Sequence, residues 1–156
     1  MQVLLPNKIA SKLIRALRKA GHQEIGGILM GECLETDCFR IVDLTIQQQG
    51  GAFASFIRSI SSTVVPLKRF FQRTNHEYQR FNYLGEWHSH PSFCTEPSVR
   101  DIHTMWEMLD DPTVGANFLV LLIVRLNATE TLESTLTVFV PQQTPFQAEF
   151  KLENAE

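Results

Sequence analysis

The sequence predicts a layered α/β domain in which a mixed β-sheet is flanked by helices. Helical patterns with apolar residues on one side alternate along the chain with short apolar segments typical of strands. A length of 156 residues suits one domain with a hydrophobic core of its own. No internal repeat, low-complexity tract or charge block divides the chain, so residues 1–156 are expected to form a single domain.

The elements follow from apolar periodicity and from the residues that begin and end them. Asn7 is a plausible N-cap for the first helix, and Gly21 is a natural stop after it. Aromatic and other apolar residues recur at helical spacing in the second helix. The predicted elements, in order, are a helix over residues 7–20, strands over 24–31 and 39–46, a loop over 47–62, a helix over 65–80, a strand over 82–88, a helix over 98–109, and strands over 117–125 and 132–140.

Charge and apolar segments limit the partners that the protein is expected to bind. A formal net charge of −3 argues against broad binding to nucleic acid or to anionic membranes. The longest apolar run, residues 118–124, is too short to span a membrane and is typical of a buried strand. No leader opens the chain, and the 3 cysteines suggest no disulfide framework. A cytoplasmic location without nucleic-acid or membrane partners is therefore the expectation.

The segment over residues 88–101 carries the clearest signs of chemistry. His88 and His90 stand two residues apart at the end of a predicted strand, so their imidazoles are expected on the same side. Pro91 follows and prevents the strand ladder from continuing. Two imidazoles on one side of a strand end can bind one metal ion. A His-x-His pair by itself is also common as polar surface.

Asp101 is a candidate for a third ligand because it lies in the first turn of the next predicted helix. Two neutral imidazoles and one carboxylate leave a fourth zinc position open to water, as in catalytic rather than structural zinc sites. Ser98 and Asp101 also fit a capping box preceded by Pro97, and capping alone could explain both residues. The spacing of all these residues together favours the metal site.

The run from His88 to Asp101 resembles the signature of the JAMM (MPN-plus, or JAB) zinc metalloproteases, which is His-x-His, seven residues, Ser, two residues, Asp. That family also has a glutamate near the start of the strand after the first helix, and Glu24 in Glu24-Ile25-Gly26-Gly27 stands in this place. No motif position departs from the pattern, and the resemblance covers nearly the whole chain. It implies the single-domain MPN fold, which is cytidine-deaminase-like.

The resemblance also implies a role for each motif residue. His88, His90 and Asp101 would hold one Zn2+ per chain. Glu24 would take a proton from the water that zinc activates and later deliver it to the leaving amine. Ser98 would donate a hydrogen bond to the oxyanion of the tetrahedral intermediate.

Two residues near the motif have open interpretations. Cys94, four residues beyond His90, is either an inert or regulatory loop cysteine or a metal ligand. Glu86 alternates onto the side of His88, where it is either an outer partner of that imidazole or an ordinary strand carboxylate.

The substrate is implied by the resemblance alone. Active members mostly cleave after the C-terminal tail of ubiquitin or of a ubiquitin-like protein. This compact chain is similar to members encoded beside ubiquitin-activating-like and conjugating-like enzymes in bacterial antiviral defence operons. The expected activity is a zinc isopeptidase or peptidase that acts on a ubiquitin-like protein and its conjugates, with those operon enzymes as further partners. The alternatives are a metallohydrolase for sulfur-carrier tails or small amides, and a non-catalytic module that binds a ubiquitin-like protein.

Two loops are expected to flank an extended substrate tail, over residues 47–62 and 92–97. The longer loop carries Phe53 and Phe56, which are costly to leave in water unless they pack or bind something. Both phenylalanines are candidates for substrate binding, and the alternative is that they cover the edge of the core.

Overall fold

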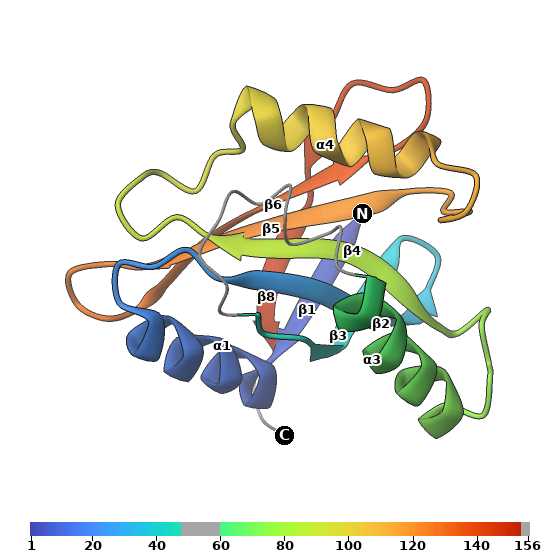
Figure 1. The fold of residues 1–156 in the computed structure, drawn as a ribbon, viewed down its shortest axis with the longest axis horizontal. Helices are drawn as coiled ribbons and strands as arrows, with labels where there is room; N and C mark the ends of the chain where they lie inside the picture. The colour runs from blue at the N-terminus through green and yellow to red at the C-terminus, as the bar shows by residue number, and fades with distance from the viewer. Residues whose placement is uncertain (48–59, 154–156) are drawn as a thin grey trace.

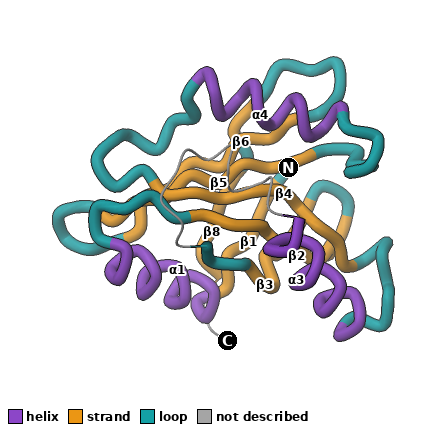
Figure 2. The backbone as a smooth tube through the Cα atoms, viewed as in Figure 1, coloured by secondary structure: helices purple, strands orange, loops and turns teal. Residues whose placement is uncertain are grey.

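The computed structural model of the chain describes residues 1–47 and 60–153, and it shows a sheet with helices on both sides (Figures 1 and 2). Its elements are, in chain order, β1 (Gln2–Pro6), α1 (Asn7–Ala20), β2 (Gly26–Glu35), β3 (Cys38–Leu44), α3 (Ile60–Arg73), β4 (Phe81–Ser89), α4 (Val99–Asp110), β5 (Leu119–Leu126), β6 (Leu132–Phe139), β7 (Phe146–Gln147) and β8 (Glu149–Glu153). Within the described residues, no helix is both long and apolar enough to cross a membrane.

The strands form one mixed sheet, in the order β7-β6-β5-β4-β2-β3-β1-β8. Strand β4 runs parallel to β5 and antiparallel to β2. Strand β1 runs parallel to both β3 and β8, and the remaining pairs are antiparallel. The predicted α/β class with a mixed sheet and flanking helices is therefore confirmed.

The last segment of the chain joins the two edges of this sheet. Strands β7 and β8 lie at opposite ends of the strand order, yet only Ala148 separates them in the sequence. Residues 146–147 pair with β6, while residues 149–153 pair with β1 along its whole length. Because one short segment pairs with both edges, the sheet curls round, and β1 and β8 cross behind the central strands in Figure 1.

The core lies on both faces of the central strands. One cluster joins α1 to the inner face of the curled sheet, with Trp87 of β4 and alternate residues of β5 among its members. Helix α4 packs through Met105 and Leu109 on the opposite face of β5, and α3 packs through Phe70 on the same side of β2. All of the apolar run over residues 118–124 except its first residue therefore lies within a central strand, with side chains buried on both faces, as predicted.

Several predicted boundaries are wrong, and each has a local reason. Asn7 is the first residue of α1 and not its cap: Pro6 occupies the cap position with extended backbone, and no side-chain cap bond forms. The second helix ends at Arg73 rather than near residue 80, because Asn75 and His76 adopt positive φ angles of 52° and 58°. The short strands β1, β7 and β8 were not predicted.

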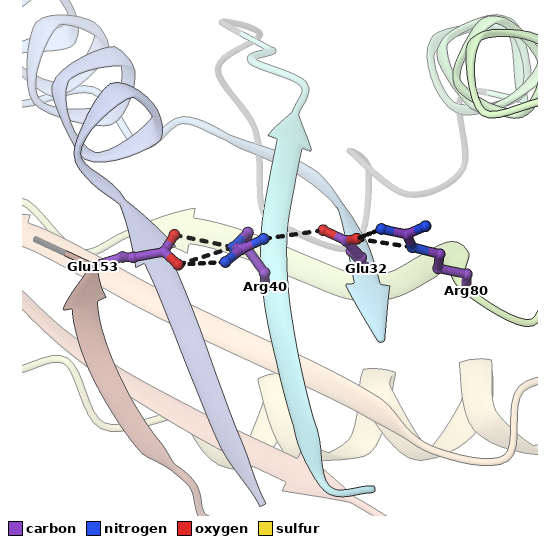
Figure 3. A network of polar contacts seen from close by, with 4 residues as sticks. All are labelled: Glu32, Arg40, Arg80 and Glu153. Carbon is purple, nitrogen blue, oxygen red and sulfur yellow. Dashed lines mark hydrogen bonds and ion pairs between the residues drawn. The ribbon is translucent and has the colours of Figure 1, made fainter. Parts of the chain in front are cut away.

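A chain of charged side chains ties β8, β3 and β2 together (Figure 3). The guanidinium of Arg40 on β3 donates to Glu153 of β8 at 2.6–3.0 Å and to Glu32 of β2 at 3.3 Å. Glu32 also accepts two bonds from Arg80, at 2.6 and 2.9 Å. Since Glu32 is only 7% exposed, its charge depends on these two arginines in place of water.

Replacing Arg40 by Met keeps most of the aliphatic stem but removes the charge that links Glu32 to Glu153. The free energy of unfolding is expected to fall by about 1–2 kcal/mol, between the values typical of exposed and buried ion pairs. Urea unfolding measures this change. The matched variant Arg18→Met removes an exposed pair with Glu130, and it should change stability by less than about 0.5 kcal/mol. Equal losses in both variants would contradict a special role for the Arg40 network.

Candidate metal centre

The two histidines of the motif lie where β4 ends. His88 is buried on β4, and His90 follows one residue after the strand. The N–H of His90 donates to the carbonyl of Val124 at 2.9 Å, so the pairing with β5 continues for one residue beyond β4. The two Nε2 atoms are 2.9 Å apart. Both imidazoles therefore point to the same side, as alternation along an extended strand predicts.

The first turn of α4 brings the carboxylate of Asp101 to these imidazoles. Ser98 caps the helix: its Oγ accepts from the N–H of Asp101 at 3.1 Å, and Asp101 Oδ2 accepts from the N–H and the hydroxyl of Ser98, both at 2.7 Å. Asp101 Oδ1 lies 3.6 Å from Nε2 of His88, and Oδ2 lies 3.9 Å from Nε2 of His90. The capping box and the metal-site hypothesis are thus not alternatives, because the box holds the carboxylate in place.

These three side chains fit a zinc ion. Their ligand atoms all lie within 4.8 Å of one another, and no other group of three or more His, Cys, Asp or Glu residues within the described part of the chain does so. Ligands of a tetrahedral zinc with bonds of about 2.0 Å are roughly 3.3 Å apart, a value that the three measured separations bracket. Burial lowers the pKa of His88 to about 4, against the opposing charge of Asp101 and with a further contribution from His90. His88 is therefore neutral at physiological pH, which is the form that binds metal.

A second interaction sets the tautomer of His90. Its Nδ1 lies 2.8 Å from the carbonyl oxygen of Cys94. A carbonyl can only accept, so Nδ1 carries the proton and Nε2 keeps its lone pair for a metal ion. Cys94 thus contributes through its backbone, and its thiol is not part of the ligand group.

The loop that contains Cys94 is tied to the sheet on the side of β5 and β6. Arg125 of β5 donates to the carbonyl of Phe93 at 2.9 Å, and the hydroxyls of Thr95 and Thr135 are 2.7 Å apart. The carbonyl that orients His90 is therefore held between two anchored residues.

Glu24 reaches the same site from strand β2. It stands two residues before the start of β2, whose first residue, Gly26, pairs with His88. Ile25 is buried in the core, whereas Glu24 is exposed and lines a cleft of about 470 Å3. This cleft is lined by all five residues predicted from the motif: Glu24, His88, His90, Ser98 and Asp101.

The approach of β2 to β4 at this point requires a glycine. A Cβ atom on Gly26 would lie 2.5 Å from the carbonyl oxygen of Trp87 and 3.1 Å from Cβ of His88. Any larger residue would therefore push β2 away from the strand that carries the histidines.

Glu86 proves to be a partner of a tyrosine. Its Oε1 accepts from the Tyr83 hydroxyl at 2.5 Å, and the buried surroundings raise its pKa to about 8, with the Tyr83 bond opposing the shift. Residues three apart would normally lie on opposite faces of a strand. The register with β2 slips at Leu84, next to Gly85 with φ of 146°, and this bulge returns Tyr83 to the side of Glu86.

The two phenylalanines that were predicted to bind substrate, Phe53 and Phe56, lie outside the described residues, so their contact with substrate stays a prediction.

Ser89, between the two histidines, is a residue that the sequence analysis did not identify. Its Oγ accepts from the N–H of Ile25 at 3.0 Å. Its position inside the motif, as a hydroxyl residue on the core side of the strand, was the available signal.

Comparisons with known proteins agree with this architecture. A family model described as prokaryotic homologs of the JAB domain matches residues 6–137. The solution structure of protein DSY2949 from Desulfitobacterium hafniense superposes with a TM-score of 0.69, covering 98% of this chain and 94% of that one. The two sequences are 18% identical, so this likeness concerns the fold alone. No curated protein sequence matches the chain significantly. Because the family model spans most of the chain and every motif residue from Glu24 to Asp101, the protein belongs to the prokaryotic homologs of the JAB domain.

Proposed function

We propose that the protein is a zinc-dependent peptidase or isopeptidase that cleaves after the C-terminal tail of a ubiquitin-like protein. The proposal is based on one observation: His88, His90 and Asp101 line the same cleft as Glu24. Three neutral or anionic ligands beside a free carboxylate are the arrangement that metal-assisted hydrolysis needs.

When bound, zinc would act as a Lewis acid and lower the pKa of a water molecule to about 7. Glu24 is exposed in the cleft, so its carboxylate can accept a proton from the attacking water and return it to the leaving amine.

Ser98 would stabilise the oxyanion. Its Oγ is held in place because it accepts from the N–H of Asp101. The hydroxyl hydrogen can rotate about the Cβ–Oγ bond without breaking that contact, so it can turn from the Asp101 carboxylate to a substrate oxygen.

A protein tail suits the cleft better than a buried small molecule does. Phe93 on its lining is 63% exposed, and Val99, next to Ser98, is 85% exposed. Apolar side chains this exposed around a polar site favour a substrate that covers the rim as well as the centre. An extended, glycine-ended tail would reach the metal ligands while the folded part of the substrate rests on the rim. Phe53 and Phe56 are proposed to contribute to the same contact.

The wider setting is a proposal that rests on the family resemblance. It places the enzyme in a bacterial antiviral conjugation system, with activating-like and conjugating-like enzymes as partners and with deconjugation or maturation as the reaction.

Metal content is the first test. The purified protein is expected to hold one zinc per chain. Loss of a residue that only orients a metal ligand typically lowers metal affinity by roughly 10- to 100-fold, and His88→Ala, which removes a ligand itself, should lower zinc affinity by more than that. Elemental analysis after dialysis measures this. His103→Ala is the control, since His103 lies exposed on α4 beside Glu107. Equal zinc in wild type and His88→Ala would refute the centre, and a zinc-free wild type would favour a non-catalytic binding module.

Catalysis is tested separately from metal binding at Glu24. Glu24→Gln is expected to reduce kcat by at least about 100-fold, the share typical of a general base, while zinc remains bound. Turnover of a ubiquitin-like fusion protein and metal content are measured on the same sample. Glu35→Gln makes the same change at an exposed position at the far end of β2 and should leave both values unaltered. If Glu24→Gln keeps most of its activity, another group is the base.

The class of substrate is tested at the rim of the cleft. Phe93→Ser should lower kcat/KM for a ubiquitin-like fusion protein at least about 10-fold more than for a short peptide amide, because only the larger substrate covers the rim. Leu152→Ser, at an exposed apolar position on edge strand β8, is the control. An equal loss for both substrates would favour the alternative of a small-amide hydrolase.

A further inference from the structure

The backbone of Ile25, the residue after Glu24, is held by a single residue of the histidine motif. The carbonyl of Ile25 accepts from the N–H of Ser89 at 2.8 Å, and the N–H of Ile25 donates to Ser89 Oγ at 3.0 Å. In a regular antiparallel pair of this kind, the second bond would run to a backbone carbonyl. Here the hydroxyl of Ser89 takes that place, at the point where β2 gives way to the segment that carries Glu24.

This hydrogen bond acts directly on the position of Glu24. The peptide group is planar, so the N–H of Ile25 and Cα of Glu24 belong to one rigid unit. Holding the N–H of Ile25 therefore fixes where Cα of Glu24 lies, and with it the point from which the Glu24 side chain begins. Glu24 itself precedes the first residue of β2, beyond the regular pairing of that strand.

The contact is shielded from water and sits beside the metal ligands without being one of them. Ser89 is 1% exposed and Ile25 is fully buried, so no solvent competes for the bond. Alternation along β4 turns Ser89 away from the side of His88 and His90. Ser89 is also the covalent neighbour of both histidines, so its two buried hydrogen bonds to Ile25 connect the backbone of the histidines to the residue after Glu24.

We propose that Ser89 is the positioning residue for the general base: it sets the place of the Glu24 carboxylate relative to His88 and His90. This inference rests on the proposed function, because it takes Glu24 as the base. Ser89 touches neither metal nor substrate, and its effect runs entirely through Glu24. Removing its hydroxyl should therefore affect the chemical step and leave metal binding and substrate binding nearly unchanged.

The structure offers a matched control on the same strand. Thr45 Oγ1 accepts from the N–H of Ile28 at 3.0 Å, which is the same type of contact three residues further along β2. Thr45→Val removes that hydroxyl with little change in shape, as Ser89→Ala does at Ile25. Both variants loosen β2, but only one of them loosens the peptide group of Glu24.

The experiment compares Ser89→Ala, Ser89→Thr and Thr45→Val in the zinc-loaded protein. Ser89→Ala is expected to lower kcat by about 10- to 100-fold, the scale of a small misplacement of a catalytic group, with KM and zinc content within about 2-fold of wild type. Ser89→Thr retains a hydroxyl and should recover most of the lost kcat. Thr45→Val should keep kcat near that of wild type. In the zinc-free protein, amide hydrogen exchange should accelerate at Ile25 in Ser89→Ala and at Ile28 in Thr45→Val.

The outcomes separate this inference from the function on which it rests. If Glu24→Gln is inactive but Ser89→Ala turns over like wild type, the positioning role is refuted and the general base stands. Equal losses of kcat in Ser89→Ala and Thr45→Val would also refute it, because they would indicate a general loosening of β2. A wild type without zinc-dependent turnover would overturn the proposed function, and the positioning role with it.

Discussion

The pairing of β2 with β4 is the constraint on which the candidate site depends. It places Gly26 opposite His88, and so brings Glu24 to the end of the strand that carries His88 and leads into His90. At Gly26 and Gly27 the backbone of neighbouring segments lies so close to β2 that there is no room for a Cβ atom. A Cβ atom at Gly26 would meet the Trp87 carbonyl at 2.5 Å, and one at Gly27 would meet the Thr45 carbonyl at 2.2 Å. Two consecutive glycines therefore let β2 lie close to both of its neighbours at the end where the site is built.

The same contacts that complete the fold also prepare the site. The capping box of α4 satisfies N–H groups at the start of the helix, and in doing so it holds Asp101 within 4 Å of both imidazoles. The Cys94 carbonyl closes the loop after β4 and sets the tautomer of His90. Burial of His88 keeps it neutral. A metal ion would thus meet ligands that are already oriented, with little entropy left to lose.

Strand β2 is held at both of its ends by different means. At the end near Glu24 the contact is the buried pair of bonds to Ser89. At the far end Glu32 is held between Arg40 and Arg80, and Arg40 in turn reaches Glu153 on β8. Strand β8 also pairs with β1 and is separated from β7 by Ala148 alone, so the C-terminal segment joins the two edges of the curled sheet that contains β2.

Much of the site was predictable because its signals are local. The spacing from His88 to Asp101 lies within one short segment, and strand alternation together with helix capping is enough to bring the three ligands to one side. Long periodic segments likewise predicted the main helices and strands. The short strands β1, β7 and β8 could not be predicted, since segments of two to five residues carry no clear period and become strands only by pairing with the edges of the sheet.

Tertiary structure decided how these local pieces meet. Alternation placed Glu86 on the side of His88, but only the bulge at Leu84 and Gly85 shows that its partner is Tyr83. Likewise, a serine between two histidines gives no hint of its partner, because Ile25 reaches Ser89 only through the register of β2. The sequence by itself determined the residue types of the site and their order along each element. Strand register, bulges and cross-strand hydrogen bonds depend on which distant segments pair with each other. A local sequence pattern does not contain that information, so only the tertiary structure shows these features.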